Sequence, residues 1–152
     1  MTLSGIGPTV NSTLPPVSAK KSVMVEAAPR IAVVDDDPSV LKALKRLLHT
    51  RSFRVQTFES AQRFLAALPD SLPDCLIVDL QMPEMDGIEL MQHLAGMGLP
   101  MIVITAHSEV GVRERCESAG AVAFLLKPLQ DSSLFAAIDA SLSAAGSPLI
   151  PG

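Results

Sequence analysis

Polar residues that suit phosphoryl transfer follow four short apolar runs of the chain. A carboxylate can attack a phosphoryl group when the negative charge of that group is neutralised. Carboxylates that hold a metal, a hydroxyl donor and an ammonium group together supply that neutralisation. The four endings are Asp35-Asp36-Asp37 after IAVV, Asp79 after CLIV, Thr105 after MIVI and Lys127 after VAFLL.

The runs that precede these residues are typical of strands in a parallel sheet with helices on both faces, because such strands are buried on both sides. Ligands of these sheets bind beyond the carboxyl ends of the strands, so we expect the four endings to meet at one edge. Strict alternation of strand and helix patterns predicts a right-handed, doubly wound α/β fold. The expected strands cover 31–34, 53–57, 75–78, 101–104 and 122–126, and the expected helices cover 38–48, 61–67, 87–95, 108–118 and 131–143.

The composition is that of one globular domain with little affinity for nucleic acid. The chain has 152 residues, 48% of them hydrophobic, a net charge of -4 and a pI near 5.3. No basic run offers the footprint that DNA or RNA requires. Cys75 and Cys116 show no zinc or disulfide spacing, and both are expected to be buried thiols. No signal peptide or membrane-spanning run is evident, so a cytoplasmic protein is expected.

Proline and small polar residues mark the two ends of the chain. Residues 1–28 show neither a helical nor a strand period and are interpreted as a flexible extension. Residues 29–146 form the expected domain, and 147–152 form a C-terminal tail.

Asp79 is the candidate nucleophile, because it stands alone at the mouth of a central strand. Asp35 and Asp36 crowd the neighbouring strand end, where a hard cation such as Mg²⁺ relieves the repulsion between carboxylates. Asp37 precedes Pro38 and is predicted to cap the first helix. A backbone carbonyl around Gln81 is a further candidate ligand.

Two more strand endings carry groups that can stabilise the negative phosphoryl oxygens. Lys127 supplies a cation opposite the metal, and Thr105 supplies a hydroxyl to another phosphoryl oxygen. A cis Lys127-Pro128 peptide is compatible with the sequence, since proline lowers the cost of the cis form.

The chain resembles the receiver domain of two-component response regulators. The resemblance covers about residues 29 to 145 and is carried by IAVVDDDPSV, CLIVDLQMPEMDGIEL, MIVITAH and GAVAFLLKP, in the order and spacing of that family. It implies a flavodoxin-like sheet of five parallel strands in the order 2-1-3-4-5.

The resemblance also implies a function. Asp79 accepts a phosphoryl group from a histidine kinase or a phosphotransfer protein, with Mg²⁺ held by Asp35, Asp36, Asp79 and the Gln81 carbonyl. Thr105 is then the switch hydroxyl, Lys127 binds phosphate, and Phe124 is the switch aromatic, although Phe124 equally suits an ordinary core position.

In that family the signal leaves through the face of helix 4, strand 5 and helix 5, here residues 110–118, 122–126 and 131–143. A downstream protein target or a second receiver is the expected partner. Enzymatic turnover is not expected beyond self-phosphorylation and self-dephosphorylation. Many receivers precede an output domain, and both a stand-alone regulator and a fragment stay open.

Two alternatives compete with the receiver. The Asp35-x-Asp37 spacing also resembles haloacid-dehalogenase-type phosphatases, with Asp35 as nucleophile and Asp37 as general acid. That family needs a late acidic motif, for which only Asp131 and Asp139 follow Lys127. The other alternative is a receiver-like interaction module that is never phosphorylated.

Overall fold

The computed structural model describes residues 28–70, 72–107 and 109–146. The predicted tail and, apart from Ala28, the predicted extension lie outside these residues. The elements are β1 (Arg30–Val34), α2 (Pro38–His49), β2 (Arg54–Phe58), α3 (Ala61–Ala67), a 3-10 turn (Leu68–Asp70), β3 (Cys75–Asp79), α4 (Gly87–His93), β4 (Met101–Thr105), α5 (Val112–Ser118), β5 (Ala121–Leu126) and α6 (Asp131–Gly146).

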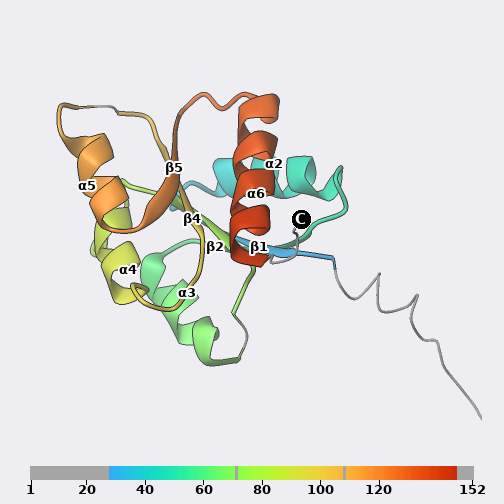
Figure 1. Ribbon diagram of the computed structural model, residues 1–152, viewed down its shortest axis with the longest axis horizontal. Helices are drawn as coiled ribbons and strands as arrows, with labels where there is room; N and C mark the ends of the chain where they lie inside the picture. The colour runs from blue at the N-terminus through green and yellow to red at the C-terminus, as the bar shows by residue number, and fades with distance from the viewer. Residues whose placement is uncertain (1–27, 71, 108, 147–152) are drawn as a thin grey trace, which may run out of the picture.

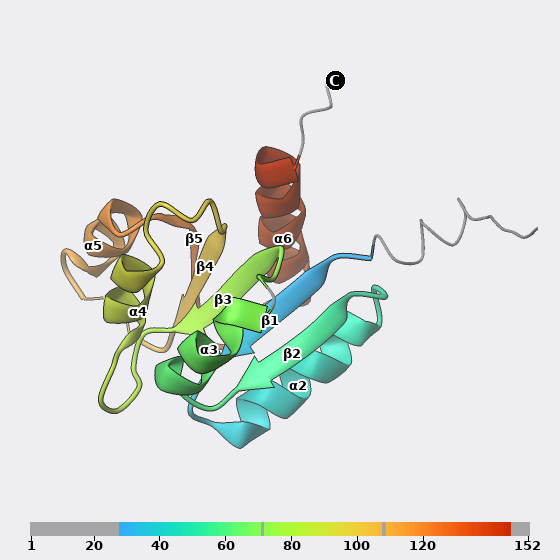
Figure 2. The ribbon, with the colours of Figure 1, turned by 90° about the horizontal axis from the view of Figure 1, so that it is seen from below.

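The strands form one parallel sheet in the order β2-β1-β3-β4-β5, which confirms the predicted topology. β3 lies at the centre, flanked by β1 and β4, and the strand arrows run the same way in Figure 2. All residues of β3 and β4 are buried, whereas the edge strand β2 is only partly covered. Asp79 and Thr105 therefore end the two best buried strands.

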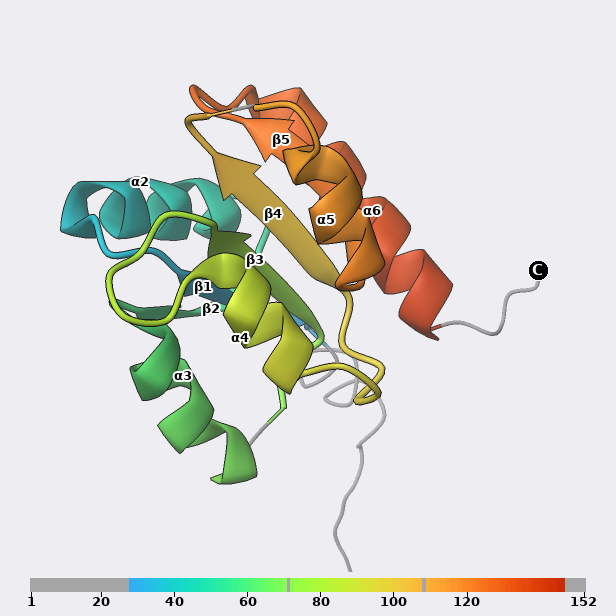
Figure 3. The same ribbon diagram turned by 90° about the vertical axis from the view of Figure 1, so that its left-hand side faces the viewer.

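Helices cover both faces of the sheet. Figure 1 and Figure 3 show α2 and α6 on one face and α3, α4 and α5 on the other. Alternate strand residues point to opposite faces, so each face has its own apolar cluster. One cluster joins Ile31, Val33, Ile77, Ile102 and Ile104 to Leu41, Leu44, Leu48, Leu134 and Ile138. The other joins Val34, Leu76, Val78, Val103 and Phe124 to Phe64, Leu90, Met91, Leu94 and Cys116.

Side-chain caps begin the first three helices. Asp37 accepts a hydrogen bond from the backbone N–H of Ser39 at 2.9 Å, directly before Pro38, as predicted. Ser60 caps α3 in the same way. Asp86 caps α4 through a reciprocal pair with Glu89, which satisfies two backbone donors that the helix itself leaves unpaired.

Some element boundaries differ from the predicted ones. α5 begins at Val112 rather than 108, because Gly111 has a left-handed conformation (φ 86°) and gives no side-chain cap. β2 begins one residue later than predicted, at Arg54. The N–H of Phe53 bonds to the Leu48 carbonyl, so Phe53 completes the turn after α2 instead of joining the sheet.

Candidate functional site

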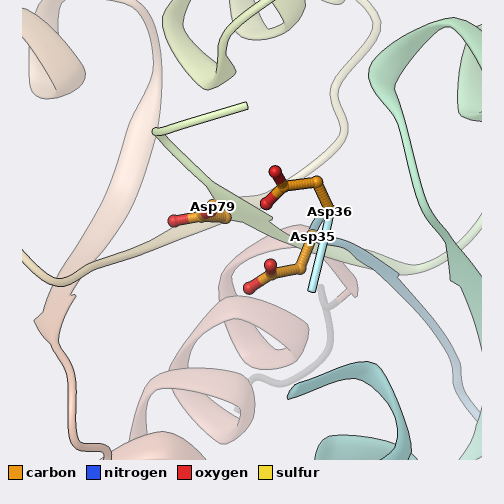
Figure 4. A group of neighbouring side chains, drawn as sticks. All are labelled: Asp35, Asp36 and Asp79. Atoms are coloured by element: carbon orange, nitrogen blue, oxygen red, sulfur yellow. The ribbon is translucent and has the colours of Figure 1, made fainter. Parts of the chain in front are cut away.

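Three carboxylates and one ammonium group meet at the carboxyl ends of the strands. Asp35 and Asp36 follow β1, Asp79 ends β3, and one oxygen from each lies within 4.8 Å of the others. Figure 4 shows these side chains next to one another. Nζ of Lys127 lies 3.0 Å from Oδ2 of Asp35 and 3.6 Å from Oδ1 of Asp79. Residues up to 92 positions apart in the sequence thus share one site.

The strand period explains why three of these side chains meet. A residue two positions beyond one that faces α2 and α6 points to the same face. Asp35, Asp79 and Lys127 each stand two positions beyond a strand residue that packs against that layer. The backbone N–H of Lys127 donates to the Thr105 carbonyl at 2.8 Å. This bond holds the end of β5 against the end of β4, the neighbour of β3.

Burial and crowding change the proton affinity of Asp79. Loss of solvation and the charge of Asp35 raise the pKa of Asp79 to about 6, against the opposing effect of Lys127. The backbone N–H of Gln81 also hydrogen-bonds this carboxylate. At neutral pH Asp79 is therefore largely ionised, but at an energetic cost that a cation would relieve.

Lys127 stays charged in spite of its partial burial. Burial by itself lowers the pKa of Lys127, but the hydrogen bond to Asp35 and the charges of Asp79 and Asp35 raise it overall. Asp35 is fully buried, and its other oxygen accepts the N–H of Asp37 at 2.9 Å. Both oxygens of Asp35 thus have a partner.

The donor set fits a hard divalent cation. Mg²⁺ prefers a few carboxylates and keeps waters or phosphate oxygens in its remaining positions. Asp35 and Asp79 are buried while Asp36 is exposed, so the cluster faces solvent on one side. Gln81 is exposed in the loop that follows Asp79.

Thr105 ends β4 at the same edge, but its hydroxyl does not contact the four charged groups. Thr105 is 1% exposed, and its Oγ1 accepts the backbone N–H of His107 at 3.2 Å. Thr105 stands two positions after Val103 and therefore points to the same face of the sheet, the one covered by α3, α4 and α5. The structure thus places Thr105 on the opposite face from Asp35.

Phe124, the predicted switch aromatic, is buried in the cluster under α3, α4 and α5. The Lys127-Pro128 peptide is cis, as the sequence allowed. Asp37 uses its carboxylate to cap α2, and this geometry gives no support to the phosphatase alternative.

Gly87 is a residue of the site that the sequence reasoning missed. A Cβ at this position would lie 2.7 Å from the carbonyl oxygen of Asp79 and 3.0 Å from Leu80. The N–H of Gly87 also bonds to the Leu80 carbonyl. A glycine after the capping residue Asp86 is the signal that could have revealed this close approach.

The model of the response regulator receiver domain family matches residues 31–139. The chain belongs to this family. It is similar to the transcriptional regulatory protein FixJ of Rhizobium meliloti, with 39% identity over 72% of this chain and 54% of FixJ. It is also similar to the response regulator protein TmoT of Ectopseudomonas mendocina, with 38% identity over 76% of this chain and 53% of TmoT. The chain thus spans about half the length of these curated relatives.

Solved receiver structures share the fold. A response regulator receiver protein from Burkholderia phymatum is 44% identical, with a TM-score of 0.69 over 80% of this chain and 99% of that one. The crystallised FixJ-N is 36% identical, with a TM-score of 0.71 over 78% of this chain and 97% of that one.

These likenesses identify a phosphoacceptor signalling domain of a two-component system. Receiver domains of this family bind Mg²⁺ at an acidic pocket, and their regulators work with a histidine kinase and a downstream effector. Among the described residues, no helix is long and apolar enough to cross a membrane.

Proposed function

We propose that Asp79 is the residue that accepts the phosphoryl group. The observation that carries this proposal is the cluster of Asp35, Asp36 and Asp79 within 4.8 Å, with Lys127 contacting two of the three carboxylates. Asp79 comes from the central strand, and its carboxylate lies close to Asp35, to Asp36 and to the ammonium group of Lys127. A carboxylate oxygen in this place has both a candidate cation site and an ammonium group close to it.

In the reaction a carboxylate oxygen of Asp79 attacks the phosphorus of a phosphohistidine. The phosphorus–nitrogen bond breaks, and the imidazole leaves with the bonding electron pair and takes up a proton. Lys127 neutralises a phosphoryl oxygen, and the hydroxyl of Thr105, which accepts the N–H of His107, donates its hydrogen to another. A Mg²⁺ bound by Asp35, Asp36, Asp79 and the Gln81 carbonyl supplies the remaining positive charge.

The donor is a histidine kinase or a phosphotransfer protein. When Asp79 is phosphorylated, the hydroxyl of Thr105 moves inward toward the phosphoryl group and the ring of Phe124 turns inward behind it. The surface formed by α5, β5 and α6 then changes shape. This face then binds a downstream protein or a second receiver. Direct nucleic-acid binding, membrane insertion and turnover of an external substrate are not part of the proposal, and the cytoplasm is the proposed location. Residues 29–146 are the proposed extent of the domain.

Intact-mass measurement after incubation with acetyl phosphate and magnesium tests the site. We expect one phosphoryl adduct on the wild-type protein and none on Asp79→Asn. Asp37→Asn is the matched control, because asparagine also caps a helix well. Full labelling of Asp79→Asn, or loss of labelling in Asp35→Asn combined with turnover of a phosphomonoester, would disprove the assignment. Absence of labelling in the wild type would revive the unphosphorylated interaction module.

A further inference from the structure

Helix α5 places an exposed arginine over a buried aromatic ring. The guanidinium carbon of Arg113 lies 5.5 Å from the ring centroid of Phe124. Phe124 is only 9% exposed, although it belongs to an edge strand whose Val122 and Leu126 are 55% and 49% exposed. Arg113 also forms an ion pair with Glu117, one turn further along the helix, at 3.4 Å.

The register of the sheet places Phe124 near Thr105, which ends the neighbouring strand. Phe124 pairs with Val103 on β4, and Thr105 stands two positions beyond Val103 on the same face. Thr105 itself pairs with Leu126, so Phe124 and Thr105 are diagonal neighbours on one face of the parallel sheet. Thr105, Val112 and Arg115 contribute to the lining of a cavity of about 150 Å³. Thr105 and the first turn of α5 therefore border the same cavity.

We propose that Arg113 is a positioning residue that holds Phe124 in its buried orientation. Arg113 thereby couples the position of α5 to the phosphorylation of Asp79. The inference rests on the proposed function, in which Phe124 is turned inward when the site is loaded. A cation over a ring face attracts it, and the aliphatic stem of the arginine shields the ring from water. An interaction that favours the inward ring also favours loading, because the two equilibria are reciprocal.

The ion pair with Glu117 explains the position of the Arg113 side chain less well than its contact with Phe124 does. Both side chains are more than half exposed, and exposed pairs one turn apart contribute little to stability.

The test uses the full chain with 4-fluorophenylalanine incorporated at position 124. Fluorine NMR reports the solvent exposure of the ring in the free protein, and titration with beryllofluoride and magnesium reports loading of the site. Arg113→Met keeps an apolar stem without the charge, Arg113→Lys keeps a cation, and Glu117→Gln removes only the ion pair. Arg46→Met, at an exposed position of α2, is the matched control.

We expect Arg113→Met to increase the exposure of the fluorinated ring and to weaken beryllofluoride binding about two- to fivefold, the size of an exposed cation–π contact. Arg113→Lys should recover part of both effects, and Glu117→Gln and Arg46→Met should stay near wild type. A lower melting temperature for Arg113→Met with unchanged ring exposure and unchanged affinity would overturn the inference. Failure of the wild type to bind beryllofluoride would refute the proposed function instead, and ring exposure would still decide whether Arg113 positions Phe124.

Discussion

Lys127 lies closer to Asp35 than to Asp79, at 3.0 Å against 3.6 Å. Asp35 has no solvent exposure, and among the described residues Lys127 is the one cation that forms an ion pair with it. The lysine therefore stabilises the metal-free fold as well as facing the proposed phosphoacceptor.

Replacement of Lys127 by methionine should destabilise the metal-free protein, because it leaves the buried Asp35 without its counter-charge. Breaking a fully buried pair costs about 3–5 kcal/mol, and we expect roughly 2–3 kcal/mol here since the lysine is partly exposed. Urea unfolding with and without magnesium chloride measures this, and magnesium should restore part of the loss. Lys42→Met, at an exposed position of α2, is the control. Equal stability of the two variants without magnesium would contradict the role of the pair.

Stability should depend on pH through Asp79. Its pKa is about 6 in the folded protein and 3.8 in the reference state, so the folded state holds the proton more tightly. Ionisation of Asp79 therefore lowers the stability of the folded protein. This loss is absent below about pH 4, grows between pH 4 and pH 6, and is complete above pH 6. Asp79→Asn should stabilise the metal-free protein by up to about 3 kcal/mol above pH 7, with no gain near pH 4. Urea unfolding across this range tests the expectation, and a gain independent of pH would refute it.

Loss of Asp36 should affect the metal and leave the fold intact. Asp36 is exposed, so Asp36→Asn should change the free energy of unfolding by less than about 0.5 kcal/mol. Removal of one carboxylate from a three-carboxylate site should weaken Mg²⁺ binding by about tenfold or more. Isothermal titration calorimetry measures the affinity, with Asp37→Asn as the neighbouring control. Unchanged affinity in Asp36→Asn would remove this residue from the ligand set.

Gly87→Ala should disturb both the fold and the phosphoryl site. The added methyl group meets backbone atoms of Asp79 and Leu80 at 2.7 and 3.0 Å, and overpacking of this kind costs about 1–3 kcal/mol. We expect slower labelling by acetyl phosphate, because the strand end that carries Asp79 must shift. Gly98→Ala is the control, since a Cβ added there would meet no described atom within 4 Å beyond its chain neighbours, and only the left-handed backbone (φ 74°) would be strained. Equal labelling rates in the two variants would show that the close approach of Gly87 does not position Asp79.

The sequence predicted the sheet because its central strands are uniformly apolar and each ends in a polar residue. The Asp37-Pro38 cap was predictable from the local rule that governs helix starts. The start of α5 was not, because the left-handed conformation of Gly111 depends on the loop before it. The same holds for Gly87, whose role comes from contact with a strand eight positions earlier in the chain.

Within the site, the sequence predicted which side chains gather and not how they pair. The closer approach of Lys127 to Asp35 than to Asp79 depends on the side-chain geometry at the strand ends. The bond from His107 to Thr105 likewise depends on the path of the loop after β4. Spacing along the chain carries neither kind of information.

Asp79 and Thr105 end adjacent strands but belong to opposite sides of the sheet. A single phosphoryl group that bridged them would connect strand ends that point to the two opposite faces of the sheet. A chemical change at this one site would in this way alter both faces of the sheet. A protein that delivers the phosphoryl group and a protein that responds to it would then not need to bind the same surface.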